Sequence, residues 1–326
     1  MNKNQNTVCL SHREDPDGVV SAVLFKNLFD SDIYLADYTN IISQLEKISQ
    51  LENLTELYIC DLSPPSHLQS DFLKIIKNID NNNTLIYFLD HHELPQSFEN
   101  NLKESNVDIV LKLDDCASAI IYDKFKNEFK NDLSFLVACA SITDHMENGT
   151  IAKQLISQQE RMFLFFNSSL LWFMIRDNQN DLKKLNPIIN GLNENKLPYE
   201  LLNDFSELKS SLIKLNQAYS EIKKSQNHYE KFNSIEIFNG KFSETLEKSL
   251  STSTKNISVV YKKNQNDQSV EILILSKSEL KISIGEVINS LCPKFNGSGG
   301  GDSEKAAAVI PDKNLKNFLN ELDLVL

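Results

Sequence analysis

An aspartate and two histidines lie next to one another at Asp90, His91 and His92, directly after the apolar run 84–89. A run of this length and composition predicts a buried strand. An acid and two imidazoles are rarely buried unless they are paired or bound to a metal. The triplet therefore indicates a metal or phosphate site at the end of the strand.

Three further apolar runs also end in an acid or a histidine. They are 7–11 before His12, 33–36 before Asp37 and 56–60 before Asp61, with Asp15 and Asp17 shortly after the first. The intervening segments 18–29, 40–51 and 65–78 carry apolar residues at three- and four-residue spacing, which is typical of helices. Alternating strands and helices predict a parallel sheet joined by right-handed crossovers.

In such a sheet, ligands bind outside the carboxyl ends of the strands. We therefore expect seven side chains to face one crevice, namely His12, Asp15, Asp17, Asp61, Asp90, His91 and His92. Asp144, which follows the apolar run 135–142, is a further candidate.

Carboxylates and imidazoles without thiolates suit Mn²⁺, Mg²⁺ or Zn²⁺, and mixed oxygen and nitrogen ligands favour Mn²⁺ or Fe²⁺. The acids and histidines outnumber the ligands of one four-coordinate ion. Their number suits two ions about 3.5–4 Å apart that share a carboxylate, an arrangement that catalyses displacement at phosphorus. The segment 12–18 and Asp61 also have a structural alternative, because an aspartate before a helix is an ordinary N-cap.

The composition limits the function classes. The chain has 326 residues, which favours two domains, and 45 acids against 33 bases give a net charge of -12. Such a chain is a poor non-specific binder of duplex DNA. Five cysteines without CxxC spacing indicate free thiols, and the apolar run 162–175 is too short and polar to span a membrane. We expect a cytoplasmic protein.

The chain changes character after residue 190. Residues 199–232 predict one long helix with a heptad seam, which is either a dimerising coiled coil or a helix that packs on its own chain. A hairpin (256–261 and 269–275), a helix (284–291), a glycine cluster (297–302), a strand (306–310) and a final helix (312–322) follow.

The predicted fold is therefore α/β. Residues 1–190 form a catalytic domain, with a mostly parallel five-stranded sheet covered by helices on both faces. Residues 191–232 form a helical linker, and residues 233–326 form a smaller mixed α/β domain for the substrate.

The order of the motifs resembles that of the DHH phosphoesterases. This family includes RecJ-type exonucleases, oligoribonucleases that also remove phosphate from pAp, and cyclic dinucleotide phosphodiesterases. The segment 12–18 resembles the first family motif, Asp61 the second, the triplet at Asp90 the third and Asp144 the fourth. Residues 297–308 resemble the glycine-rich motif of the associated C-terminal domain, DHHA1.

The resemblance implies a role for each motif residue. One ion would be held by His12, Asp15 and Asp61. The second would be held by Asp17, Asp61, His91 and Asp144, so that Asp61 bridges the two. His92 would lie over the substrate phosphate as a donor or general acid, and Asp90 would orient a histidine. The nucleotide end of the substrate would be bound by Ser298, Gly299, Gly300 and Gly301.

Three features depart from the family pattern. His12 and Asp15 are three residues apart, where relatives have two or four. Asp302 stands where the glycine-rich motif often ends in histidine, and an arginine common after the central strand of DHHA1 is missing from residues 275–278. The spacing concerns the metal ligand His12, whereas the other two departures concern the substrate more than the metal site.

The expected function is hydrolysis of phosphodiester or phosphomonoester bonds in short oligonucleotides or small nucleotides such as pAp. The cofactor would be two Mn²⁺ ions, with Mg²⁺ as an alternative. Other interpretations are a RecJ-like single-strand exonuclease, an inorganic pyrophosphatase or polyphosphatase, and a catalytically reduced protein that binds nucleotides or partners a replication complex.

Overall fold

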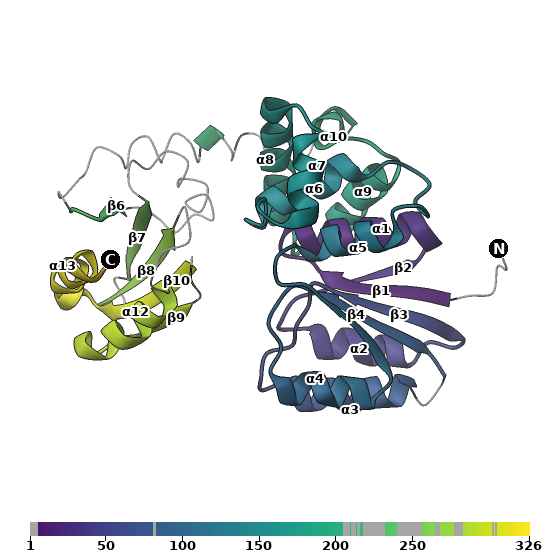
Figure 1. Cartoon of the computed structure of the whole chain (residues 1–326), viewed down its shortest axis with the longest axis horizontal. Helices are drawn as coiled ribbons and strands as arrows, with labels where there is room; N and C mark the ends of the chain where they lie inside the picture. The colour runs from purple at the N-terminus through teal and green to yellow at the C-terminus, as the bar shows by residue number, and fades with distance from the viewer. Residues whose placement is uncertain are drawn as a thin grey trace. The chain divides into compact units, whose positions relative to one another are not determined.

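A computed structural model describes residues 6–80, 83–204, 209, 213, 216–217, 232–239, 256–264, 268–276, 283–301, 303 and 305–326. The chain divides into two compact units, residues 1–212 and 213–326 (Figure 1). Most positions of the predicted heptad seam, from residue 205 onward, lie outside the described residues, as does Asp302.

The first unit is built on a parallel five-stranded sheet of order β2-β1-β3-β4-β5. Its strands are β1 (Asn6–His12), β2 (Asp32–Ala36), β3 (Leu54–Cys60), β4 (Leu85–Asp90) and β5 (Val107–Leu111). The predicted sheet is confirmed. Because β1, β3 and β4 are adjacent at its centre, their carboxyl ends lie next to one another.

Helices cover both faces of this sheet (Figure 1). One face carries α2 (Ile41–Ser49), α3 (Gln69–Asp80) and α4 (Gln96–Glu104), and the other carries α1 (Pro16–Phe29) and α5 (Ala117–Phe125). The rings of Phe72, Phe88 and Phe98 form a buried cluster beneath the first group. Complete burial of each such side chain contributes about 1.5–3 kcal/mol relative to exposure.

A layer of helices completes the first unit beyond α1 and α5 (Figure 1). It consists of α6 (Ser134–Thr143), α7 (Thr150–Ser157), α8 (Arg161–Asn178), α9 (Leu182–Asn193) and α10 (Pro198–Asp204). Helix α8 contains the apolar run 162–175 and packs against α6. Among the described residues, no helix is long and apolar enough to cross a bilayer.

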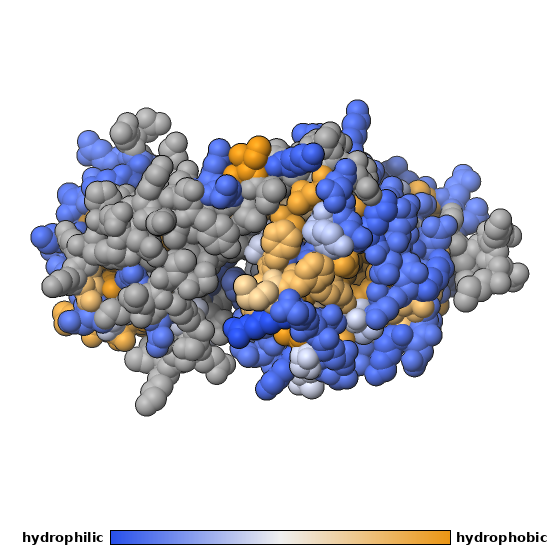
Figure 2. All heavy atoms as spheres, turned by 90° about the horizontal axis from the view of Figure 1, so that it is seen from above, coloured by the Kyte–Doolittle hydropathy of each residue, from blue (hydrophilic) through white to orange (hydrophobic). Residues whose placement is uncertain are grey.

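The two ends of α8 differ in exposure. Side chains 170–175 are buried, whereas four large apolar side chains near its start are exposed: Met162, Phe163, Phe165 and Phe166. Figure 2 shows apolar side chains gathered on the surface of the first unit in the region of α8. This helix therefore belongs partly to the core and partly to the surface.

The second unit contains a mixed five-stranded sheet of order β6-β7-β8-β10-β9. The strands are β6 (Ile235–Asn239), β7 (Ile257–Asn264), β8 (Ser269–Ser276), β9 (Ser298–Gly301) and β10 (Lys305–Pro311). Helices α12 (Ile284–Leu291) and α13 (Leu315–Val325) share a core with this sheet. The predicted hairpin is the antiparallel pair of β7 and β8, whereas β6 and β9 were not predicted as strands.

Candidate metal centre

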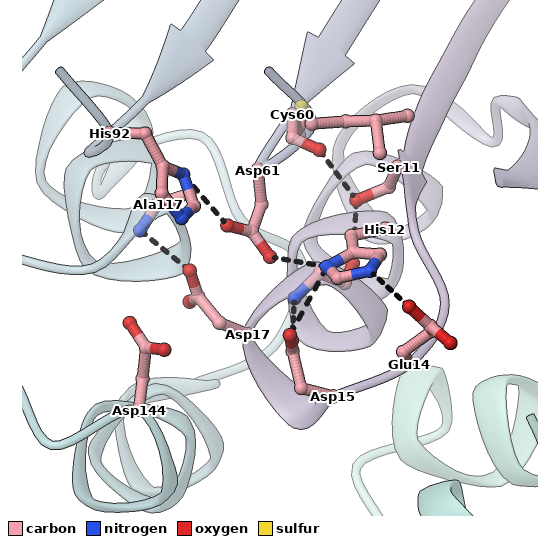
Figure 3. A network of polar contacts seen from close by, with 12 residues as sticks. Ser11, His12, Glu14, Asp15, Asp17, Cys60, Asp61, His92, Ala117 and Asp144 are labelled. Carbon is pink, nitrogen blue, oxygen red and sulfur yellow. Dashed lines mark hydrogen bonds and ion pairs between the residues drawn. The ribbon is translucent and has the colours of Figure 1, made fainter. Parts of the chain in front are cut away.

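Acids and histidines gather at the carboxyl edge of the parallel sheet. His12 ends β1, Asp61 directly follows β3, Asp90 ends β4, and His91 comes next. Figure 3 shows side chains from these strand ends pointing toward one another, together with side chains from the start of α1 and the end of α6. Three overlapping groups of potential metal ligands result, and within each the ligand atoms lie within 4.8 Å of one another.

The first group contains His12, Asp15 and Asp61. The Nδ1 atom of His12 is 3.1 Å from Oδ2 of Asp15 and 3.7 Å from Oδ2 of Asp61. Asp15 is also the N-cap of α1, because its other oxygen accepts a hydrogen bond from the Gly18 N–H. Asp15 can therefore cap the helix with one oxygen and offer the other oxygen to a metal ion.

The second group contains Asp17, His91 and Asp144. The Nε2 atom of His91 is 3.5 Å from Oδ2 of Asp144 and 3.3 Å from Oδ1 of Asp61. Asp17 also accepts hydrogen bonds from the N–H groups of Ala117 and Ser118 at the start of α5. Because Asp61 belongs to the first group and also contacts His91, it connects the two groups.

The backbone of Asp61 has an unusual conformation, with φ of 52°. This left-handed region is uncommon for residues other than glycine, but aspartate and asparagine enter it more easily than most. The Asp61 N–H donates to the carbonyl of Leu89 on β4. The turn after β3 is thus fixed by the neighbouring strand.

The third group adds Asp90 and His92. Asp90 is fully buried, and one of its oxygens lies 2.7 Å from Nδ1 of His92 and accepts from the N–H groups of His91 and His92. The other oxygen accepts from Leu62 N–H and Ser63 Oγ. Both oxygens accept hydrogen bonds from the protein, as those of Asp17 do, and one of them holds the His92 ring, which is compatible with the predicted orienting role.

The acids of the site shift the pKa values of its histidines and of one another, which makes the site attractive to a cation. Burial alone lowers the pKa of His12, but the carboxylates of Asp15 and Asp61 outweigh it and raise this pKa to about 11. For His91, Asp61 and Asp144 likewise outweigh burial and raise the pKa to about 10. Burial, followed by repulsion from like charges, raises the pKa of Asp17 to about 6 and that of Asp144 well above its usual value.

Two buried carboxylate oxygens support the same conclusion. Oδ2 of Asp61 and Oδ2 of Asp144 accept no hydrogen bond from the part of the chain that is described. A buried charged oxygen without a hydrogen bond is costly unless another partner neutralises it. The donor set of carboxylates and imidazoles, together with these two oxygens, fits a divalent cation.

Several residues near the site were not predicted from the sequence. Glu14 contacts the His12 ring, Tyr38 packs its ring 5.2 Å from the same imidazole, and Ser63 binds Asp90. Asp37 also directly follows a strand, but it pairs with Arg13 and is in none of the three groups. Asp37 follows the edge strand β2, whereas Asp61 follows the central strand β3. This difference in strand position distinguishes the two residues.

The glycine cluster lies in the second unit as the edge strand β9. A Cβ on Gly299 would lie 2.5 Å from the Ala307 carbonyl oxygen, and one on Gly300 would lie 2.9 Å from Oδ1 of Asn289 on α12. Close packing by β10 and α12 therefore explains the glycines structurally. Whether Ser298–Gly301 bind a nucleotide stays a prediction.

Comparisons with known proteins agree with this architecture. Residues 229–326 match the family model of the DHHA1 domain. The match falls in the C-terminal unit, which therefore resembles a DHHA1 domain. A comparison with curated proteins gives no match.

Three solved structures share the fold of the whole chain. The pGpG-specific phosphodiesterase PggH from Vibrio cholerae has a TM-score of 0.61 at 14% identity, over 98% of this chain and 98% of that one. RecJ from Thermus thermophilus in complex with Mn²⁺ has a TM-score of 0.58 at 12% identity, over 99% of this chain and 52% of that one. The DHH domain of a member of a ribosomal protein family has a TM-score of 0.58 at 10% identity, over 97% of this chain and 85% of that one.

At these identities the likeness concerns the fold. Together with the DHHA1 match, it confirms the predicted resemblance to DHH phosphoesterases with a DHHA1 domain. The roles of the individual site residues stay predictions.

Proposed function

We propose that this protein is a metal-dependent phosphoesterase that acts on short oligonucleotides or small nucleotides. The observation that carries the proposal is the position of Asp61 between two groups of ligands. One group would hold the first ion through His12 and Asp15, and the other would hold the second through Asp17, His91 and Asp144. Asp61 would bridge the two ions.

Bound Mn²⁺ or Mg²⁺ ions would supply a nucleophilic water at neutral pH and neutralise charge on the phosphoryl oxygens. His92 is the residue best suited to meet the substrate. Its side chain is 42% exposed, against 7% for His12 and 12% for His91. Asp90 holds its Nδ1, so Nε2 is left to donate a hydrogen bond to a phosphate oxygen or to a leaving group.

The substrate class rests on separate observations. Residues 229–326 match the family model of the DHHA1 domain, and PggH, which has a similar fold, is a pGpG-specific phosphodiesterase. The net charge of -12 disfavours long duplexes. We therefore propose a nucleotide or short single-stranded substrate, bound in part by Ser298–Gly301.

The decisive test is Asp61→Asn. Asparagine tolerates the left-handed backbone at this position, so the variant should fold and yet lose the bridging carboxylate. We expect hydrolysis of pGpG, pAp or a short single-stranded oligonucleotide with Mn²⁺ to fall by at least about a hundredfold, because a shared ligand of both ions is lost. Asp71→Asn, on the exposed side of α3, is the matched control and should keep full activity.

Undiminished activity in Asp61→Asn, or in EDTA, would contradict the proposal. The same substrate panel separates the alternatives. A RecJ-like exonuclease would degrade a single-stranded 20-mer in preference to dinucleotides, and a pyrophosphatase would prefer pyrophosphate. A protein that only binds nucleotides would retain them without hydrolysis.

A further inference from the structure

The imidazole of His12 is held at both of its nitrogens. Nδ1 faces the cluster, 3.1 Å from Asp15 and 3.7 Å from Asp61. On the opposite side of the ring, Nε2 lies 3.3 Å from Oε2 of Glu14 (Figure 3). The ring itself is almost completely buried and packs against Tyr38, so it has little freedom to turn.

Glu14 is itself fixed by its neighbours. Its backbone carbonyl accepts a hydrogen bond of 3.2 Å from Nη1 of Arg176, near the end of α8. The preceding residue, Arg13, donates its N–H to the carbonyl of Ala36 and pairs through its guanidinium with Asp37. The loop between β1 and α1 is therefore attached on one side to the end of β2 and on the other to α8.

This arrangement matters because a histidine can bind a metal through only one nitrogen at a time. The other nitrogen keeps its proton. A carboxylate that accepts a hydrogen bond from this N–H sets both the tautomer and the orientation of the ring. His12 has such a carboxylate only two residues away in the chain.

We propose that Glu14 is a positioning residue that directs Nδ1 of His12 toward the first metal ion by accepting a hydrogen bond from Nε2. This inference rests on the proposed function. It assigns Glu14 no contact with substrate and no direct bond to metal. The Glu14 side chain is 37% exposed, so its effect should be moderate.

The experiment compares Mn²⁺ binding to the full chain and to three variants by titration calorimetry. Glu14→Ala removes the acceptor, and we expect one of the two binding steps to weaken about tenfold, the lower end of the range for such partners. Glu14→Gln removes the charge but keeps an acceptor oxygen, so it should lose less. Glu93→Ala removes an equal charge from an exposed residue beside the triplet and should bind as the unchanged protein does.

A second measurement reports on the ring itself. In protein labelled with ¹⁵N-histidine and loaded with diamagnetic Mg²⁺, the His12 signal should show a protonated Nε2, and Glu14→Ala should reduce this preference. Coordination through Nε2, or equal weakening of both binding steps in Glu14→Ala, would overturn the inference.

The two proposals fail in different ways. If the unchanged protein takes up no divalent ion, the proposed function is overturned and the role of Glu14 with it. If the unchanged protein binds two ions and Glu14→Ala binds them equally well, only the role of Glu14 is overturned.

Discussion

The carboxylates of the site are crowded, and this crowding opposes folding in the absence of metal. Asp144 is the clearest case, because burial and the nearby charge of Asp17 raise its pKa well above the usual value. A carboxyl group whose pKa is raised by folding destabilises the folded state at neutral pH, since folding then requires either the uptake of a proton or the burial of a repelled charge. Asp144, which would bind metal, therefore destabilises the folded protein when no metal is bound.

We predict that Asp144→Asn stabilises the metal-free protein and weakens its binding of Mn²⁺. Each kcal/mol recovered should raise the melting temperature of a unit of this size by about 2–4 °C. Differential scanning fluorimetry in EDTA and with added Mn²⁺ measures both effects. A lower melting temperature in EDTA would show that Asp144 has a structural role.

We also predict that metal binding releases protons. The pKa values of His12 and His91 are about 11 and about 10, so both rings carry a proton at pH 7 that a metal ion must displace. Affinity should therefore rise with pH below these values, by up to about tenfold per pH unit for each proton released. Calorimetry in two buffers of different ionisation enthalpy should detect at least two protons, since Asp144 can add to those of the two histidines, and His12→Gln should reduce the number by one.

The candidate ligands could be predicted from the sequence because each follows an apolar run or precedes a helix. Glu14 could not, because the sequence of a loop does not show which neighbour its side chain meets. The hydrogen bonds from Ala117 and Ser118 to Asp17 cross about 100 residues of chain, so no local pattern contains them.

At the scale of single elements, helix α1 is tied to the end of β1. A Cβ on Gly18 would lie 2.4 Å from the carbonyl oxygen of His12 and 2.5 Å from its Cβ. The Ser11 hydroxyl also donates to the carbonyl of Gly18. The absence of a side chain at Gly18 thus lets the helix approach the strand that carries His12.

We expect Gly18→Ala to destabilise the protein by about 1–3 kcal/mol, as overpacking in a core does. Because the added methyl group must displace His12, Mn²⁺ affinity should fall as well. Lys26→Ala, on the same helix but only partly buried, is the control and should have little effect on either property. Chemical denaturation and calorimetry measure the two changes, and unchanged affinity would contradict the proposed link.

The parallel strands and the helices α1 to α3 could be predicted from the sequence. The spacing of their apolar residues and the polar residues at the end of each apolar run indicated them. Strand β9 did not, because a run of glycines has no side chains from which a two-residue alternation can be read. Its pairing with β10 and its contact with α12 decide its structure instead. The prediction of a heptad seam, and of a homodimer formed through it, concerns mostly residues that the structure does not describe.

At the scale of the whole molecule, each unit has a core of its own. All proposed metal ligands belong to the first unit, so metal should stabilise that unit selectively. Scanning calorimetry of the full chain should show a transition that rises with Mn²⁺ concentration and a second that does not. A single transition that shifts as a whole would indicate that the units unfold together.

The proposed ligands lie between residues 12 and 144, whereas the DHHA1 match begins at residue 229. Chains are translated at about 5–20 residues per second and fold from the N-terminus. The first unit ends at residue 212, and the 114 residues from 213 to 326 take roughly 6–23 s to synthesise at that rate. During this interval the proposed metal centre could assemble on the ribosome before the second unit is complete, so the ions available near the translating chain would be the first to compete for it.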